Sequence, residues 1–133
     1  MFTDLASIRT AVKDRLTPLL PSGWKFEPTL EGTVKALTPV LYIEFVRVDT
    51  RQEGAPLGAG QVLASFNLII TDPKTDTAKA EDAVDSHLVP IIRALDSFDD
   101  LYWENTEKRR LQDGPLAWIV QAFAFVKTIE TEE

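Results

Sequence analysis

Residues 40–71 read VLYIEFVRVDTRQEGAPLGAGQVLASFNLIIT, and this stretch decides the fold. Two apolar runs, residues 40–48 and 61–71, predict β-strands because they are rich in Val, Ile, Leu and Phe. Between them, residues 49–60 contain three Gly and one Pro, which predicts a mobile loop or an extended hairpin tip. The second run stops at Asp72-Pro73. The stretch therefore predicts two long strands joined by a loop.

A long helix is expected after the second strand. From about Thr75 to Phe98, apolar residues recur at helical spacing and acidic residues lie away from that stripe. Pro90 falls inside this pattern and removes one backbone donor. We therefore expect a kink, or a break into two helical pieces, near Ser86 to Pro90.

Two further strand patterns, residues 101–111 and 116–129, predict a C-terminal β-hairpin. The turn signal Asp113-Gly114 lies between them. Pairing about that turn sets two pairs of residues opposite each other: Arg109 with Trp118, and Leu111 with Leu116. In that register the guanidinium group could lie over the indole ring.

The N-terminal side predicts one more helix and a short strand. Thr3 or Asp4 can cap a helix whose apolar residues, from Leu5 to Leu19, recur at three- and four-residue spacing. This helix should end at Pro21-Ser22-Gly23. Residues 24–27 then alternate between aromatic and charged side chains, which predicts a short edge strand.

The order of elements predicts one α+β domain over residues 1–133, with a mostly antiparallel sheet, two helices packed on one face and a closing C-terminal β-hairpin. The acidic tail, residues 130–133, is expected to fray. Three strands are apolar on both faces, although two helices cover only one face. Either the sheet curls over itself or another subunit covers its second face, and self-association is the favoured explanation.

The net charge of −7 is concentrated in one part of the chain. Residues 1–66 carry seven acidic and seven basic side chains, whereas residues 72–107 carry ten acidic and three basic ones. An acidic surface repels phosphates, which disfavours sequence-independent DNA binding through this region. The basic run Lys108-Arg109-Arg110 predicts either a solvated hairpin or a salt-bridge patch that faces an acidic neighbouring subunit.

No group of residues in the sequence is typical of catalysis, metal binding or cofactor binding. The chain has no Cys, and His87 is its single histidine, which argues against a metal site and a hydrolytic triad. His87 is expected to be a partly buried structural side chain. The carboxylates of Glu81, Asp82 and Asp85 should spread over the solvent side of the long helix.

Over nearly its full length the chain resembles the tail terminator family of long-tailed bacteriophages. The resemblance lies in the order of four features: the opening helix DLASIRTAVKDRLTPLLP, the loop RQEGAPLGAG, the long helix TDTAKAEDAVDSHLVPIIRALDSF and the closing strand LAWIVQAFAFVKTI. It implies a non-enzymatic subunit, with no cofactor, that assembles with copies of itself as a hexameric ring on the major tail-tube protein. The ring would stop tube growth and offer its other surface to the head-side connector protein.

The resemblance also implies a place in the virion tail, at the head–tail junction, after assembly in the host cytoplasm. DNA would pass through the ring without being specifically bound, and no membrane is involved. Subunit or tube contacts are expected from the loop 50–60, the hairpin 107–115 and the strands 40–48 and 116–126. The candidate interface residues in these regions are Arg47, Arg51, Gln52, Glu53, Leu57, Lys108, Arg109, Arg110 and Trp118. The alternative function is a small-molecule-binding or accessory domain with a pocket between helices and sheet.

Overall fold

The computed structural model describes residues 2–28, 33, 38–52, 55–72, 78–111 and 116–127, and the side chains of residues 51, 52, 55, 56, 78–81 and 83 lie outside this description. The expected turn at 112–115 and the acidic tail at 130–133 also lie outside the described residues. The elements are α1 (Leu5–Leu16), a 3₁₀ turn η1 (Thr17–Leu19), β1 (Lys25–Phe26), β2 (Val40–Asp49), β3 (Arg51–Gln52), β4 (Ala55–Pro56), β5 (Gln61–Thr71), α3 (Ala78–Leu95), β6 (Leu101–Arg110) and β7 (Leu116–Lys127).

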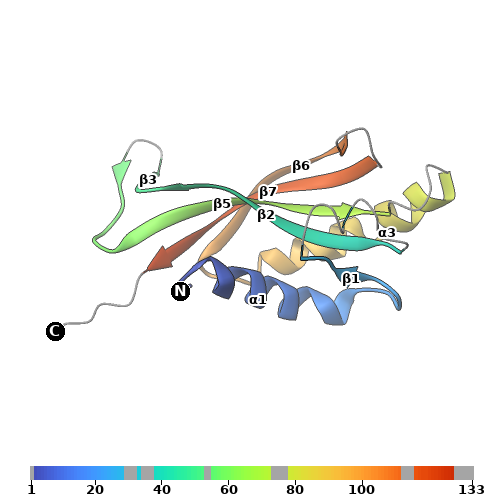
Figure 1. The fold of residues 1–133 in the computed structure, drawn as a ribbon, viewed down its shortest axis with the longest axis horizontal. Coiled ribbons are helices and arrows are strands. Elements are labelled where there is room, and N and C mark those ends of the chain that lie inside the picture. Colours follow the sequence, from blue (N-terminus) through green and yellow to red (C-terminus); the bar gives the residue numbers. More distant parts are fainter. Residues whose placement is uncertain are drawn as a thin grey trace.

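One five-stranded sheet, in the order β1-β2-β5-β7-β6, forms a layer that α1 and α3 cover from one side (Figure 1). β1 runs parallel to β2, and every other neighbouring pair in this sheet is antiparallel. β3 and β4 form a separate ribbon that extends from the end of the sheet where β2 stops and β5 begins (Figure 1). The predicted α+β fold with a closing β6–β7 hairpin is therefore confirmed.

The first helix begins where the sequence predicts a cap. The Asp4 carboxylate accepts a hydrogen bond from the Ser7 N–H at 2.7 Å, and the Ser7 hydroxyl oxygen accepts one from the Asp4 N–H at 3.2 Å. This reciprocal pair satisfies N–H groups that have no partner within the helix. α1 ends at Leu16, earlier than expected, and the chain tightens into η1 because Pro18 has no N–H to continue the α-helical ladder.

The main core lies between the two helices and the sheet. Its largest fully buried side chain is Phe66, at the centre of β5. α1 contributes Ile8, Val12 and Leu16, which are fully buried at helical spacing. The strands and α3 also contribute Leu41, Ile43, Leu68, Ile70, Val84, Leu88, Ile91, Leu95, Leu101, Val120, Ala122, Ala124 and Val126.

The expected break in the long helix does not occur, because α3 runs without interruption from Ala78 to Leu95 with Pro90 inside it. Pro90 leaves the carbonyl of Ser86 without its usual helical donor. Both residues are exposed, so water can solvate that carbonyl and the helix can continue.

The hairpin register differs from the expected one by one residue. Lys108, not Arg109, lies opposite Trp118, and Arg110, not Leu111, lies opposite Leu116. Leu111 leaves the ladder and is 7% exposed, packed with Ile69 and Ala117. Burying this leucine lengthens the connection by one residue, which a count from the Asp-Gly turn signal does not anticipate.

The face of the sheet opposite the helices, here called the open face, is not uniformly apolar. Its central row is polar: Glu44, Asn67, Gln121 and Asn105 face one another across β2, β5, β7 and β6. On one side of this row the cluster around Leu111 buries the sheet surface. Leu111 of the same chain thus covers part of the second face, and the choice between a curled sheet and a covering subunit stays a prediction.

Candidate functional site

The candidate interface residues lie at opposite ends of the sheet. Arg47 is near the end of β2, followed by β3, whereas Lys108, Arg109 and Arg110 end β6 at the far end of the strands (Figure 1). Trp118 lies beside Lys108 on β7. The structure therefore brings Lys108 and Trp118 together and separates them from Arg47.

At the β2 end, the exposed Arg47 donates from its Nε to the Asp49 carboxylate at 2.8 Å. Leu57 is half-buried, and its N–H donates to the Thr50 carbonyl at 3.0 Å, which closes the base of the β3–β4 ribbon. Arg51 and Gln52 form β3, but their side chains, and all of Glu53, lie outside the described residues.

At the β6 end, Lys108 takes the place that the sequence assigns to Arg109. Its Nζ lies 5.2 Å from the centre of the Trp118 indole and 3.2 Å from the Asp85 carboxylate of α3. Arg109 instead pairs with Glu107 on its own strand, and Arg110 is exposed. The expected stacking of Arg109 on Trp118 is therefore wrong, because the hairpin register points Lys108 toward the helix layer and Arg109 toward the open face.

Asp85 makes internal contacts at this end of the sheet that the sequence did not predict. The Trp118 indole N–H donates to its carboxylate at 2.6 Å, and three helical turns later Asp96 accepts from the Trp103 indole N–H at 2.9 Å. Positions 11 residues apart lie on nearly the same side of a helix. Asp85 therefore ties the hairpin to α3, and Asp96 ties it to the position directly after α3. A search for acidic residues spaced by 11 along this segment could have suggested both contacts.

Asp85→Ala is expected to lower the free energy of unfolding by about 1–2 kcal/mol, because it removes two hydrogen bonds to a partly exposed carboxylate. Asp82→Ala is the matched control, since Asp82 is exposed on the same helix and should change stability by less than about 0.5 kcal/mol. Urea unfolding followed by tryptophan fluorescence measures both. Equal stability of the two variants would contradict the tethering role of Asp85.

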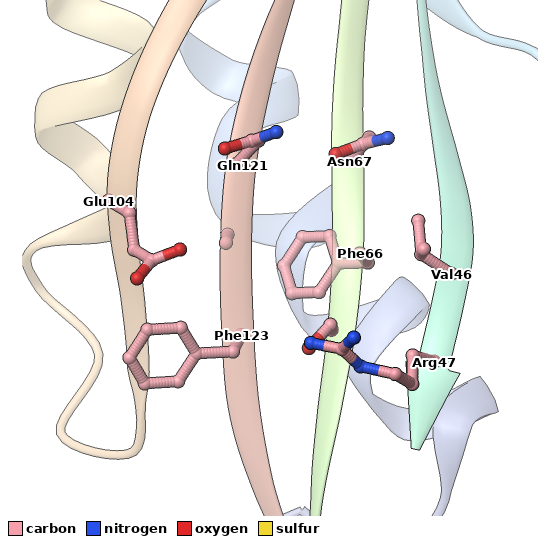
Figure 2. Close-up of a pocket in the computed structure, with 9 residues that line it drawn as sticks. Val46, Arg47, Phe66, Asn67, Glu104, Gln121 and Phe123 are labelled. Atoms are coloured by element: carbon pink, nitrogen blue, oxygen red, sulfur yellow. The ribbon is translucent and has the colours of Figure 1, made fainter. Parts of the chain in front are cut away.

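A hollow of about 250 Å³ lies on the open face (Figure 2). Figure 2 shows Asn67 and Gln121 side by side on its floor, with Arg47 on the β2 side and Glu104 on the β6 side. The β2 register shifts between Phe45 and Arg47, and the β6 register shifts between Trp103 and Asn105, so each flanking strand has a β-bulge here. The bulges leave Val46 and Glu104 outside the ladder and shape the two rims.

An aromatic cluster adjoins this hollow. The Phe123 ring is tilted against that of Tyr102 and edge-on to that of Phe125, with ring centroids 5.6 Å and 6.2 Å apart respectively. Tyr102 is 47% exposed, although its hydroxyl donates to the Asp99 carbonyl. Exposed aromatic side chains of this kind are enriched at protein interfaces.

The described residues outside these regions show no further arrangement typical of a functional site. His87 is half-buried and its ring lies 5.3 Å from the Trp24 ring in an edge-on arrangement, as expected of a structural side chain. A second hollow, of about 190 Å³, lies between α1 and β1 and is lined by Arg9, Lys13 and Glu27. Within the described ranges, no three His, Cys, Asp or Glu side chains are grouped to hold a metal ion. Nor do those ranges contain a helix that is both long and apolar enough to cross a membrane.

No family model and no curated protein sequence matches this chain. Among solved structures, the chain is similar to the sheath/tube terminator of an extracellular contractile injection system, PVC, in its extended state. The TM-score is 0.60 at 11% sequence identity, over 98% of this chain and 58% of that chain. This chain thus spans less than two thirds of the terminator's length.

A second similarity, to the type 4 fimbrial biogenesis protein PilO of Pseudomonas aeruginosa, has a TM-score of 0.32 at 10% identity over 92% of this chain and 85% of that chain. This score is too low to bear on the fold. The first similarity shows that nearly all of this chain shares its fold with part of a sheath/tube terminator of a contractile injection system.

Proposed function

We propose that this chain is a non-enzymatic structural subunit that forms a ring on the end of a tail tube and stops its polymerisation. The observation that carries the proposal is the fold shared with a sheath/tube terminator over 98% of this chain. The order of helices and strands that resembles phage tail terminators supports the same role. The proposed place of the protein is therefore the tail of a long-tailed phage or of a related tail-like assembly.

The distribution of the candidate residues supports a ring. A closed ring uses two different surfaces of each subunit, and one must complement the other. The basic residues of β6 and the part of β2 near Arg47 lie on opposite edges of the sheet, because β6 is one edge strand and β1 covers only the first two residues of β2. Each copy can therefore present one of these surfaces to each neighbour. One face of the ring would bind the tube protein, and the other would bind the head-side connector protein.

Tube length tests the capping function. The tube protein of the same tail should form tubes of variable, run-on length when it polymerises alone. Addition of this chain should shorten the tubes in proportion to its amount, and electron microscopy should show extra density at one end. A tube-length distribution that does not change at a molar excess of the chain would contradict the proposal.

Charge reversal of the hairpin, Arg109→Glu with Arg110→Glu, is expected to weaken ring assembly by at least about tenfold, since rim charges across an interface select the partner and fix the register. Both residues are exposed, so the isolated fold should keep its stability within about 0.5 kcal/mol. Lys13→Glu with Arg93→Glu, on α1 and α3, is the control because both residues are exposed and this pair changes the net charge by the same −4. Light scattering over a concentration series measures the association. Equal assembly of the hairpin variant and the wild type would contradict the proposed role of Arg109 and Arg110 in subunit contacts.

A further inference from the structure

The sheet has two edges that lack a strand partner on their outer side within the described part of the chain. β6 pairs with β7 only, and β1 covers only the first two residues of β2. The uncovered part of β2 includes Val46 and Val48, which are 59% and 49% exposed. Free backbone edges of this length, with exposed apolar side chains, are templates for pairing with another strand.

We propose that the uncovered edge of β2 in one copy pairs with β6 of the next copy, so that the sheet continues from subunit to subunit. This inference rests on the proposed function, because it assigns the contact that builds the ring. β2 and β6 run antiparallel within one sheet, since three antiparallel pairings separate them. Copies in the same orientation, as a cyclic ring requires, therefore place β2 and β6 as an antiparallel pair.

The backbone groups that face outward on β2 can be identified. The Leu41 carbonyl faces outward because it accepts the Glu27 N–H at 2.8 Å. The β5 partners of Phe45 and Val48 lie an even number of residues from the β5 partner of Leu41. Because backbone groups alternate in direction along a strand, the backbone groups of Phe45 and Val48 also face outward. Ile43 belongs to the same set by the same count.

The same reasoning applies to β6. The Asp100 carbonyl faces β7 because it accepts the Phe125 N–H at 3.0 Å. Counting from Asp100, the backbone groups of Trp103, Thr106 and Lys108 face outward. The outward-facing residues of both edges carry their side chains on the helix side of the sheet, where Phe45 packs on the core and Lys108 contacts α3. Pairing them keeps the helices of both copies on the same side.

Charge selects one register. With Val48 opposite Thr106 of the next copy, the open-face side chains set Arg47 opposite Glu107 and Glu44 opposite Arg109. A shift of two residues in one direction sets Arg47 opposite Arg109. The opposite shift sets Glu44 opposite Glu107. The exposed pairs that Arg47 and Arg109 make within their own strands are weak enough to exchange for the new partners.

This register also has the geometry of a closed sheet. Within one copy, the strand pairing across the sheet aligns Glu107 of β6 with Tyr42 of β2. Arg47 is the second open-face side chain after Tyr42 in the paired part of β2. The proposed pairing of Glu107 with Arg47 therefore shifts each copy by four residues along the strand direction relative to the next copy. Each copy contributes four long strands, so the shift is one residue per strand. An eight-stranded barrel with a shear of 8 has the same ratio of shear to strand number, and its strands tilt by about 36°. The stagger therefore tilts the strands by an angle that closed sheets adopt.

A disulfide trap tests the contact, because the natural chain contains no cysteine. The variant Glu44→Cys with Arg109→Cys places two thiols at a non-hydrogen-bonded pair of the proposed interface, where Cα atoms lie about 4.5 Å apart. Within one copy the same positions are separated by three strand spacings, roughly 14 Å or more, which no disulfide spans. Each covalent bond must therefore join two copies.

Oxidation of this variant at an assembling concentration should give a ladder of covalent multimers that stops at the ring size on a non-reducing gel. The control Glu44→Cys with Glu107→Cys samples the shifted register and should cross-link at least about tenfold more slowly. Rings of wild-type mass without the covalent ladder, or equal cross-linking in both variants, would overturn the edge pairing and leave the ring function standing. The absence of any assembly would overturn both.

Discussion

Phe66→Ala is expected to lower the free energy of unfolding by about 3–5 kcal/mol, the usual cost of removing a buried Phe side chain from a core. Phe66 is 1% exposed on the central strand β5, and its ring lies 5.9 Å from that of Phe45. The loss has two parts, the lost burial of the ring and the cavity that remains beneath α1 and α3. Urea or thermal unfolding followed by far-UV circular dichroism measures this change.

Phe123→Ala is the matched control for this experiment. Phe123 lies on the adjacent strand β7 but points to the open face, where it is half-buried beside the hollow (Figure 2). Its truncation should cost about 1–2 kcal/mol, because a partly exposed ring loses less burial. If the two variants lost equal stability, the division of the sheet into a core face and an open face would be wrong.

Val48→Pro is expected to abolish assembly, which corresponds to at least a hundredfold weaker association, and to leave a folded monomer. The Val48 N–H faces away from β5, so a proline here removes a donor only from the free edge. Proline is accepted on an edge strand when its missing N–H would have faced solvent. A proline also removes one interstrand hydrogen bond to the next copy and obstructs the approach of β6 of that copy.

Val48→Thr separates this effect from a change of side chain, because threonine is β-branched like valine and retains the N–H. Light scattering should show monomers for Val48→Pro and wild-type assembly for Val48→Thr, and circular dichroism should show the same fold for both. Normal rings from the proline variant would refute pairing at this edge. An unfolded proline variant would refute the outward orientation of the Val48 N–H.

Regular periodicity made most of the fold predictable. Both long helices follow from apolar residues at a spacing of about 3.6, and Asp4 follows from capping preference. The strands β2 and β5 follow from apolar runs rich in Val, Ile, Leu and Phe, and β6 and β7 follow from strand patterns on either side of the Asp-Gly signal. The order of these elements was enough to predict helices on one face of a mostly antiparallel sheet. Local pattern and final fold agree here because each element buries its own apolar stripe against the same core.

Features that depend on contacts between distant residues were not predictable. The one-residue change in hairpin register comes from the burial of Leu111 against Ile69, which lies 42 positions earlier in the chain. The bulges at Val46 and Glu104 insert one residue each and redirect the strands without any local signal. Asp85 reads as a solvated helix residue until the fold places Trp118 next to it. The candidate site therefore follows from the register, which sequence patterns fix less firmly than the elements themselves.

The acidic character of residues 72–107 takes a more specific form in the structure. Asp85 and Asp96 accept hydrogen bonds from tryptophans, so part of this charge fastens α3 to the hairpin. Glu107 lies on the open face of β6, where the proposed ring sets it opposite Arg47 of the next copy. The charge that first indicates a soluble acidic surface thus also contributes to internal tethering and to the proposed choice of neighbour.

The mass of the assembled protein tests the central claim most directly. Native mass spectrometry or mass photometry over a concentration series should show monomers of 14.9 kDa giving way to one discrete species. A hexameric ring has a mass of about 89 kDa, six times that of the chain, and negative-stain images of this species should show closed rings with a central opening. A monomer at every concentration, stabilised instead by a small ligand, would contradict the proposed ring and favour the alternative binding domain.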